Sequence, residues 1–204
     1  MKKLFGQTKL TWLRVILCAV VTALYTGIAL SIEFLDNTSF QDIGVYLEWW
    51  FLFGIIIVVN SEKWWEASLK CFVFFLISQP LIYLIQVPFN TLGWGIFMYY
   101  KRWFIITLLT LPGAAVGFLL KKKNWISSIV LCVPILYFAN AAVSYFAWAM
   151  RSMPRHILSA IFCLAMTVLL PIYTLDEKKH RALPYIIAIL MIAGCVVVPG
   201  LRLI

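Results

Sequence analysis

The sequence predicts an all-α integral membrane protein, a bundle of about seven transmembrane helices whose N-terminus lies in the cytoplasm. Of its 204 residues, 64% are hydrophobic and 12% are charged, which is too little polar surface to cover a soluble fold. The hydrophobic residues form runs of about 20, the length that an α-helix needs to cross a bilayer. Short basic clusters separate these runs, as is typical of membrane-protein loops. We therefore expect one transmembrane domain over residues 1–204, with six spans as the alternative to seven.

The first span is expected from about Val15 to Ile32. This run is longer than the apolar part of a typical secretion signal and lacks a convincing small-x-small cleavage site before Glu33, which indicates a retained helix. Small residues recur every four positions along it and form one helical face that lets a neighbouring backbone approach closely. That face is a predicted helix–helix contact, and its residues are Ala19, Ala23, Gly27 and Ser31.

The Ala-x3-Ala pattern of Ala19 and Ala23 resembles the first helix of the substrate-binding S-components of ECF-type vitamin transporters. In that family such a face docks on the transmembrane coupling subunit, so the resemblance implies a membrane-protein partner for the Ala19, Ala23 and Gly27 face. The same spacing is common wherever helices of one chain lie against each other. Contact within the bundle is the interpretation that we favour.

The second span is expected from about Ile43 to Asn60, after an acidic loop on the non-cytoplasmic side, residues 33–44. Glu48, Trp49 and Trp50 lie in its outer third. Tryptophan near the end of a span is usually an interfacial anchor, and Glu48 is shallow enough to reach back to the headgroups. The alternative places Glu48 inside the bundle, where it would pair with a cation or a substrate amine.

The third span, from about Ala67 to Gln86, contains Gln79-Pro80 near its centre. Proline removes one helical hydrogen bond, so we expect an interruption there, with Gln79 available to bond the freed carbonyl or to line a cavity. Glu66 and Lys70 are four residues apart at its start, which predicts an ion pair that lets Lys70 enter the interface.

The fourth span, from about Trp103 to Leu120, is predicted to be interrupted at Pro112-Gly113 and to make close helix contacts through Gly113 and Gly117. An aromatic and glycine-rich segment, residues 87–103, precedes it. We expect that segment to form a short interfacial helix or a shallow re-entrant turn. Three lysines follow the span and mark the cytoplasmic side, residues 121–123.

Three further spans complete the predicted bundle: Trp125 to Met150, Pro154 to Leu175 and Leu183 to Leu201. Asn140 lies near the middle of the first of them and is expected to bond a neighbouring helix or a ligand. A loop on the cytoplasmic side, residues 176–181, joins the last two and holds His180, which we expect to be solvated.

The distribution of the 17 lysines and arginines supports this topology. Twelve fall on the predicted inner side and five on the outer side, as the positive-inside rule expects. The outer five are Lys101, Arg102, Arg151, Arg155 and Arg202. We therefore expect a multi-pass protein of the cell membrane with its C-terminus outside.

A group of outer cations forms the predicted binding site. If these side chains converge, they attract a small anionic ligand or a lipid headgroup. The alternative, which we favour, is that they pair with the outer acids Glu33, Asp36, Asp42 and Glu48. To these basic residues we add two polar residues within the spans, Gln79 and Asn140, and the shallow acid Glu48. The candidate substrate-binding residues are therefore Lys101, Arg102, Arg151, Arg155, His156, Gln79, Asn140 and Glu48.

The sequence contains no nucleophile elbow, Walker loop, HExxH motif or metal-ligand cluster. We therefore predict no catalytic residue, no metal and no cofactor. The net charge of +9 belongs to loops and does not indicate nucleic acid. The cysteines stand singly in apolar runs and are expected to be free: Cys18, Cys71, Cys132, Cys163 and Cys195.

Of the functions that this architecture allows, we favour a small-molecule permease or the substrate-binding membrane component of a transporter. Interrupted third and fourth spans, with Gln79 and Asn140 available to a cavity, are typical of such proteins. No charge is expected deep in the membrane, which argues against a proton relay through intramembrane carboxylates. The alternatives are an accessory or assembly subunit that acts through helix packing, and a membrane enzyme that acts on lipid-linked substrates.

Overall fold

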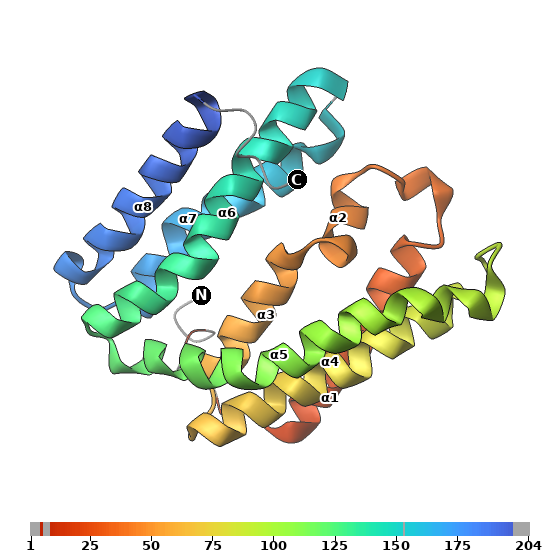
Figure 1. Cartoon of the computed structure of the whole chain (residues 1–204), viewed down its shortest axis with the longest axis horizontal. Helices are drawn as coiled ribbons and strands as arrows, with labels where there is room; N and C mark the ends of the chain where they lie inside the picture. Colours follow the sequence, from red (N-terminus) through yellow and green to blue (C-terminus); the bar gives the residue numbers. More distant parts are fainter. Residues whose placement is uncertain (1–4, 6–8, 153, 198–204) are drawn as a thin grey trace.

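The computed structural model describes residue 5, residues 9–152 and residues 154–197, and over these residues it contains helices and no strand (Figure 1). Within this part of the chain, six helices are long and apolar enough to cross a membrane. They are α1 (Trp12–Ala29), α4 (Trp64–Gln86), α5 (Tyr100–Gly117) with the flanking 3-10 helices η3 (Gly93–Tyr99) and η4 (Phe118–Lys122), α6 (Trp125–Ser152), α7 (Ile157–Thr174) and α8 (Lys178–Val197). The predicted all-α membrane bundle is confirmed.

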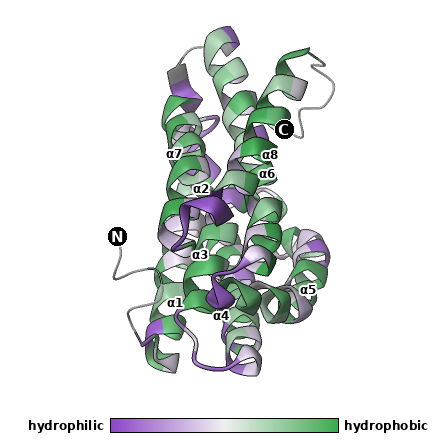
Figure 2. Cartoon of the chain, turned by 90° about the vertical axis from the view of Figure 1, so that its left-hand side faces the viewer, coloured by the Kyte–Doolittle hydropathy of each residue, from purple (hydrophilic) through white to green (hydrophobic). Residues whose placement is uncertain are grey.

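Two further helices, α2 (Ser39–Val45) and α3 (Leu47–Val59), are bent by 59° where they meet, and counted together as one broken span they bring the number to seven. They are joined by Tyr46, whose backbone is extended (φ −101°, ψ 163°). Two short 3-10 helices lie in loops, η2 (Glu33–Leu35) and η5 (Pro154–His156). Figure 2 shows α2 as a hydrophilic segment beside helices that are mainly hydrophobic.

The helices form two groups with α3 between them (Figure 1). In one group α4 lies between α1 and α5, and in the other α6 contacts both α7 and α8. Each group has a hydrophobic core, and α3 contributes to both. Leu52, Ile55 and Val59 belong to the α6–α7 core, whereas Trp50 and Val58 belong to the α1–α4 core. The two faces of α3 therefore hold the halves of the molecule together.

The position of the helix break differs from the prediction. We expected interruptions at Pro80 and Pro112, but α4 and α5 continue as α-helices through both prolines. A proline inside a spanning helix removes a single backbone hydrogen bond, and neighbouring groups make this loss tolerable. The interruption instead lies in the second span, which the sequence predicted to be one helix.

Close contact between α1 and α2 accompanies this break. A Cβ atom added at Gly44 would lie 2.2 Å from Thr26 Cγ2, so only glycine allows α2 to lie this near α1. Tyr46, in the link, packs edge-on against Tyr145 at 5.8 Å and beside Trp148 at 6.3 Å, both on α6. The bend is thus held by contacts from distant parts of the chain.

Two loop predictions also need correction. The second half of the expected acidic loop, residues 39–44, belongs to α2. The expected inner loop of residues 176–181 is shortened because α8 begins at Lys178. His180 is consequently a helical residue that is 5% exposed, with its ring edge-on to Trp125 at 5.1 Å. The predicted end of the last span, near Leu201, lies outside the described residues.

Candidate functional site

Charged groups are buried on one side of α3, next to the α2–α3 break. Asp42, on α2, accepts hydrogen bonds at Oδ2 from Ser159 Oγ at 2.6 Å and pairs with His156 Nδ1 at 2.9 Å. Ser39 extends the cluster, since its hydroxyl donates to the carbonyl of Arg155 at 2.9 Å and accepts from the backbone N–H of Ser159 at 3.1 Å. These bonds tie α2 to η5 and α7, and they satisfy the buried Asp42 carboxylate.

Glu48 lies in the first turn of α3 and is 2% exposed. Neither of its carboxylate oxygens has a hydrogen-bond partner among the described residues. Tyr145, on α6, interacts with it electrostatically, and the Tyr145 hydroxyl is likewise buried and unpaired within the described structure. Glu48 is therefore a buried carboxyl group whose surroundings supply no cation.

The position of Glu48 corrects the prediction that it reaches back to the headgroups. The bend at Tyr46 turns the start of α3 into the bundle, so Glu48 faces α6 and α7 and not the membrane surface. It also corrects the expectation that no charge lies in the interior, because Asp42, Glu48 and Lys70 are 5%, 2% and 2% exposed.

Aromatic rings enclose the cluster. The His156 ring stacks on Tyr145 with a centroid distance of 5.9 Å and meets Trp148 edge-on at 5.3 Å. Tyr46 covers the same region from the link between α2 and α3. Such rings exclude water from the buried carboxyl groups, which strengthens the electrostatic interactions among them.

An apolar groove runs along α3 beside this region, with Leu47, Phe51 and Ile55 in its lining. It has a volume of about 580 Å³, and its lining is almost wholly apolar. The walls come mainly from α3, α5 and α6, and α4 adds Cys71 and Phe75. The lining includes Trp50, Gly54 and Val58 on α3, Gly113 on α5 and Pro134 on α6. The Trp50 indole N–H is buried and has no hydrogen-bond partner among the described residues, so the groove offers one spare donor near its lining.

A second cavity of about 380 Å³ shares one lining residue, Leu120, with the groove. Three cations and one acid contribute to it, Lys121, Lys123, Arg181 and Asp176. Lys123 pairs with Asp176 at 2.8 Å, and Arg181 donates to the Leu175 carbonyl at 2.8 Å. The cavity therefore carries a net positive charge.

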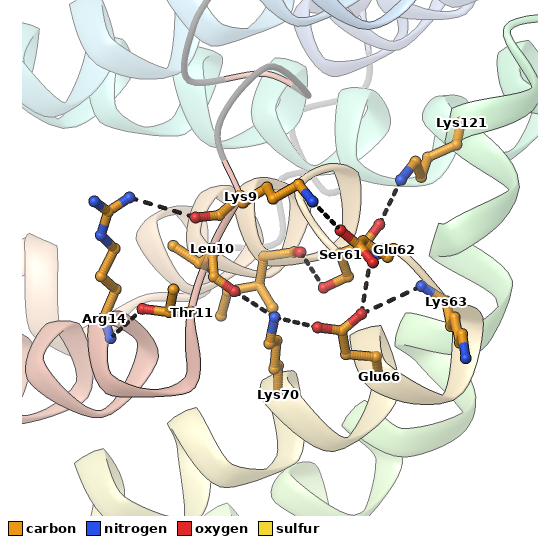
Figure 3. Close-up of polar contacts among 11 residues, drawn as sticks. Lys9, Leu10, Thr11, Arg14, Ser61, Glu62, Lys63, Glu66, Lys70 and Lys121 are labelled. Carbon is orange, nitrogen blue, oxygen red and sulfur yellow. Dashed lines mark hydrogen bonds and ion pairs between the residues drawn. The ribbon is translucent and has the colours of Figure 1, made fainter.

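A separate ion network joins segments that the sequence analysis predicted to be cytoplasmic (Figure 3). Lys70 is bonded to Glu66 at 2.5 Å and to the Leu10 carbonyl, and Lys121 donates to the Ser61 carbonyl. Lys9 pairs with Glu62 at 2.9 Å. The predicted Glu66–Lys70 pair is confirmed.

The two members of the exposed Lys9–Glu62 pair influence each other's titration. The hydrogen bond from Lys9 and its positive charge lower the pKa of Glu62 below its ordinary value. The same interaction raises the pKa of Lys9. Both side chains are largely exposed, so water and salt screen this pair far more than the buried one.

The structure does not bring together the five basic residues of the predicted site, Lys101, Arg102, Arg151, Arg155 and His156. Lys101 and Arg102 are exposed at the start of α5, whereas Arg151 and Arg155 are exposed at the end of α6 and in η5, on the other helix group (Figure 1). Only His156 is buried, and it forms the one predicted acid pairing that the described residues contain, with Asp42.

The two polar candidates of the spans lie in different helix groups. Gln79 is 2% exposed on α4, and its Nε2 atom has no partner among the described residues. Asn140, on α6, donates from Nδ2 to Cys195 Sγ on α8 at 3.2 Å. Asn140 therefore links two helices, and all five cysteines are free, as predicted.

The small residues of α1 lie against α4. Ala19 and Ala23 are fully buried, and a Cβ atom added at Gly27 would lie 2.8 Å from Ile85 Cβ and Cγ2. The Ser31 hydroxyl caps this face by donating to the Gly27 carbonyl at 2.7 Å. On α5, Gly113 borders the open groove, and Gly117 approaches Val58 of α3.

Comparison with protein-family models, with curated proteins and with solved structures finds no match for this chain. The geometry of the site is therefore what supports a function.

Sequence reasoning missed the Asp42–Ser159 contact and the basic cavity beside the groove. Asp42 and Ser159 are 117 residues apart, and no local pattern relates them. One signal was present for the acidic cluster: Asp42 and Glu48 lie on either side of the expected start of the second span, and acids within a membrane are functional candidates. The bend that buries both residues has no proline to indicate it.

Proposed function

We propose that this protein is the substrate-binding membrane component of a small-molecule transport system, and that its substrate is an anionic amphiphile. The observation that supports this proposal is the groove of about 580 Å³ between α3, α5 and α6. Ligand sites are commonly cavities of about 300–1,000 Å³ with mainly apolar walls. The groove has the size and lining for a hydrocarbon chain.

The neighbouring charges support an anionic group at one end of that substrate. Leu120 lines both the groove and the basic cavity, so a chain in the groove would end near Lys121, Lys123 and Arg181. These residues bring three positive charges against the one negative charge of Asp176. A carboxylate or phosphate group is the complement of this arrangement.

The accessory-subunit alternative has less support. The small-residue face that suggested it, Ala19, Ala23 and Gly27, is occupied by α4 of the same chain. A partner on that face would have to displace α4.

The test is photo-crosslinking of the purified protein in detergent with a long-chain fatty acid that carries a diazirine on its chain. Mass spectrometry locates the labelled residues. We expect labelling concentrated on groove residues of α3, α5 and α6, and weaker labelling by the fatty alcohol of the same chain length, because the alcohol lacks the anionic group.

A matched pair of variants controls this experiment. Gly113→Phe fills the groove without a clash, since no atom lies within 4 Å of a Cβ at Gly113. Leu108→Phe alters the same helix at an exposed position that does not line the groove. We expect the first change alone to abolish the labelling. Equal labelling of all lipid-facing helices, unchanged by Gly113→Phe, would contradict the proposal.

A further inference from the structure

Glu48 is the one buried acid whose charge the described structure leaves without compensation. Asp42 has His156 and Ser159, and Glu66 has Lys70. Glu48 is 2% exposed, and neither of its oxygens has a hydrogen-bond or ion-pair partner among the described residues. An ionised carboxylate removed from water without a partner is so unfavourable that such a group takes up a proton instead.

The side chains around Glu48 do not provide a positive charge. Titratable groups face Glu48 or the neighbouring Asp42 from four elements: Tyr46 in the α2–α3 link, Tyr137 and Tyr145 on α6, Cys163 on α7 and His156 in η5. Of these, His156 alone can carry a positive charge, and it is bonded to Asp42. The negative charge of Asp42 disfavours a second negative charge on Glu48.

One local feature favours the ionised form and makes the proton exchangeable. Glu48 lies in the first turn of α3, a helix of 13 residues, where the unpaired N–H groups and the helix dipole favour a negative charge. The helix begins there because the span is broken at Tyr46. Interrupted helices whose ends point into the bundle are how many secondary transporters form ion sites.

We propose that Glu48 binds a proton at the α2–α3 break, and that release of this proton is coupled to the substrate groove through α3. The first part stands on the geometry of Glu48 alone. The coupling rests on the proposed function, because α3 carries Glu48 on one face and lines the groove with Trp50, Gly54 and Val58. A metal ion would need several oxygen ligands, whereas a proton needs one carboxylate oxygen and an apolar setting.

The test is reaction of the protein in detergent with an apolar carbodiimide, which adds to protonated carboxyl groups that lie in apolar surroundings. Peptide mapping of the wild-type protein identifies the modified residue. We expect Glu48 to be the main site, and we expect its modification rate to fall at least tenfold as the pH is raised through the titration of the carboxyl group.

Two variants separate Glu48 from the adjacent acid. Glu48→Gln has the shape of the protonated side chain and should fold normally while losing the modification. Asp42→Asn should keep it. The infrared carbonyl band of a protonated carboxylic acid should be present in the wild type and in Asp42→Asn, and absent from Glu48→Gln.

The outcomes distinguish this inference from the proposed function. Modification elsewhere with Glu48 untouched, or a Glu48 reaction that sodium ions suppress at constant pH, would overturn the proton site. Glu48 could be modified as expected while the fatty-acid probe binds equally well to the wild type and to Glu48→Gln at all pH values. This result would keep the proton site and overturn the coupling. Absence of fatty-acid labelling in the groove of the wild-type protein, with the Glu48 reaction intact, would overturn the proposed function and the coupling with it.

Discussion

Lys70 and Glu48 are both charged residues within predicted membrane spans, and each is 2% exposed, yet their surroundings differ completely. Lys70 is bonded to the Glu66 carboxylate and to the Leu10 carbonyl, and it lies over the Trp12 ring at 5.6 Å. Glu48 has no bonded partner among the described residues. The Lys70 charge is neutralised by groups of the same chain, so its bonds hold helices together and serve the structure. The Glu48 carboxyl group has no such partner in the described part of the chain and must bind a ligand from outside it, which makes Glu48 a candidate functional residue.

The largest effect is expected at the satisfied site. Glu66→Ala leaves the Lys70 ammonium group buried with only the Leu10 carbonyl and the Trp12 ring, so the free energy of unfolding should fall by about 3 kcal/mol. Denaturant unfolding in detergent micelles measures the change. The matched control is Glu62→Ala, which removes an acid from the exposed Lys9 pair and should lower stability far less. Equal effects would show that burial does not distinguish the two pairs.

A second, smaller loss is expected at the break that buries Glu48. Gly44→Ala would place a methyl group 2.2 Å from Thr26 Cγ2, which forces α2 away from α1 and should cost about 2 kcal/mol of unfolding free energy. Gly54→Ala on α3 is the control, because no atom lies within 4 Å of its Cβ position. The Gly44→Ala change should also make Glu48 more accessible to a water-soluble carbodiimide. A fully stable Gly44→Ala protein would mean that the bend does not need this close contact.

The two acids on either side of Tyr46 should respond differently to neutralisation. Asp42→Asn weakens charge-assisted bonds with His156 and Ser159 and should lower the free energy of unfolding by about 1.5 kcal/mol. Glu48→Gln breaks no hydrogen bond that the described residues make, so its stability should match or exceed that of the wild type. Thermal unfolding of both variants at neutral pH checks this order. If Glu48→Gln were instead the less stable variant, Glu48 would not be the unpaired one of the two carboxyl groups.

The smallest effect is a pH dependence at the exposed end of the ion network. The pKa of Glu62 is lowered in the folded protein by the hydrogen bond and charge of Lys9. A carboxyl group with a lowered pKa stabilises the fold above its unfolded pKa, and this contribution is lost as the pH falls through its folded pKa. The wild type should therefore lose slightly more thermal stability than Lys9→Ala on acidification below about pH 4.5. Parallel curves for the two proteins would exclude a contribution from the pair.

The predicted helices agree closely with the observed ones where the pattern is a simple apolar run between charges. The expected span from Trp125 to Met150 is α6 (Trp125–Ser152), and the expected span from Ala67 to Gln86 is α4 (Trp64–Gln86). Glu66 and Lys70 were predictable as a pair because they are neighbours on one helix face.

The errors occurred where distant segments decide the local structure. Pro80 and Pro112 suggested breaks because proline removes a hydrogen bond, but both helices continue through them. The actual break, at Tyr46, depends on Thr26 of α1 and on Tyr145 and Trp148 of α6. None of these contacts is visible in a local window of sequence.

Hydrophobic length and loop charge are properties of each segment of the chain, so the amino-acid sequence was enough to predict a membrane protein and the approximate positions of its spans. Which charged groups find partners depends on how the helices pack against each other. The partners of Asp42 lie more than a hundred residues away, and the bend that turns Glu48 inward is held by α1 and α6. The apolar groove along α3 and the unpaired Glu48 carboxyl group therefore became visible only in the folded chain.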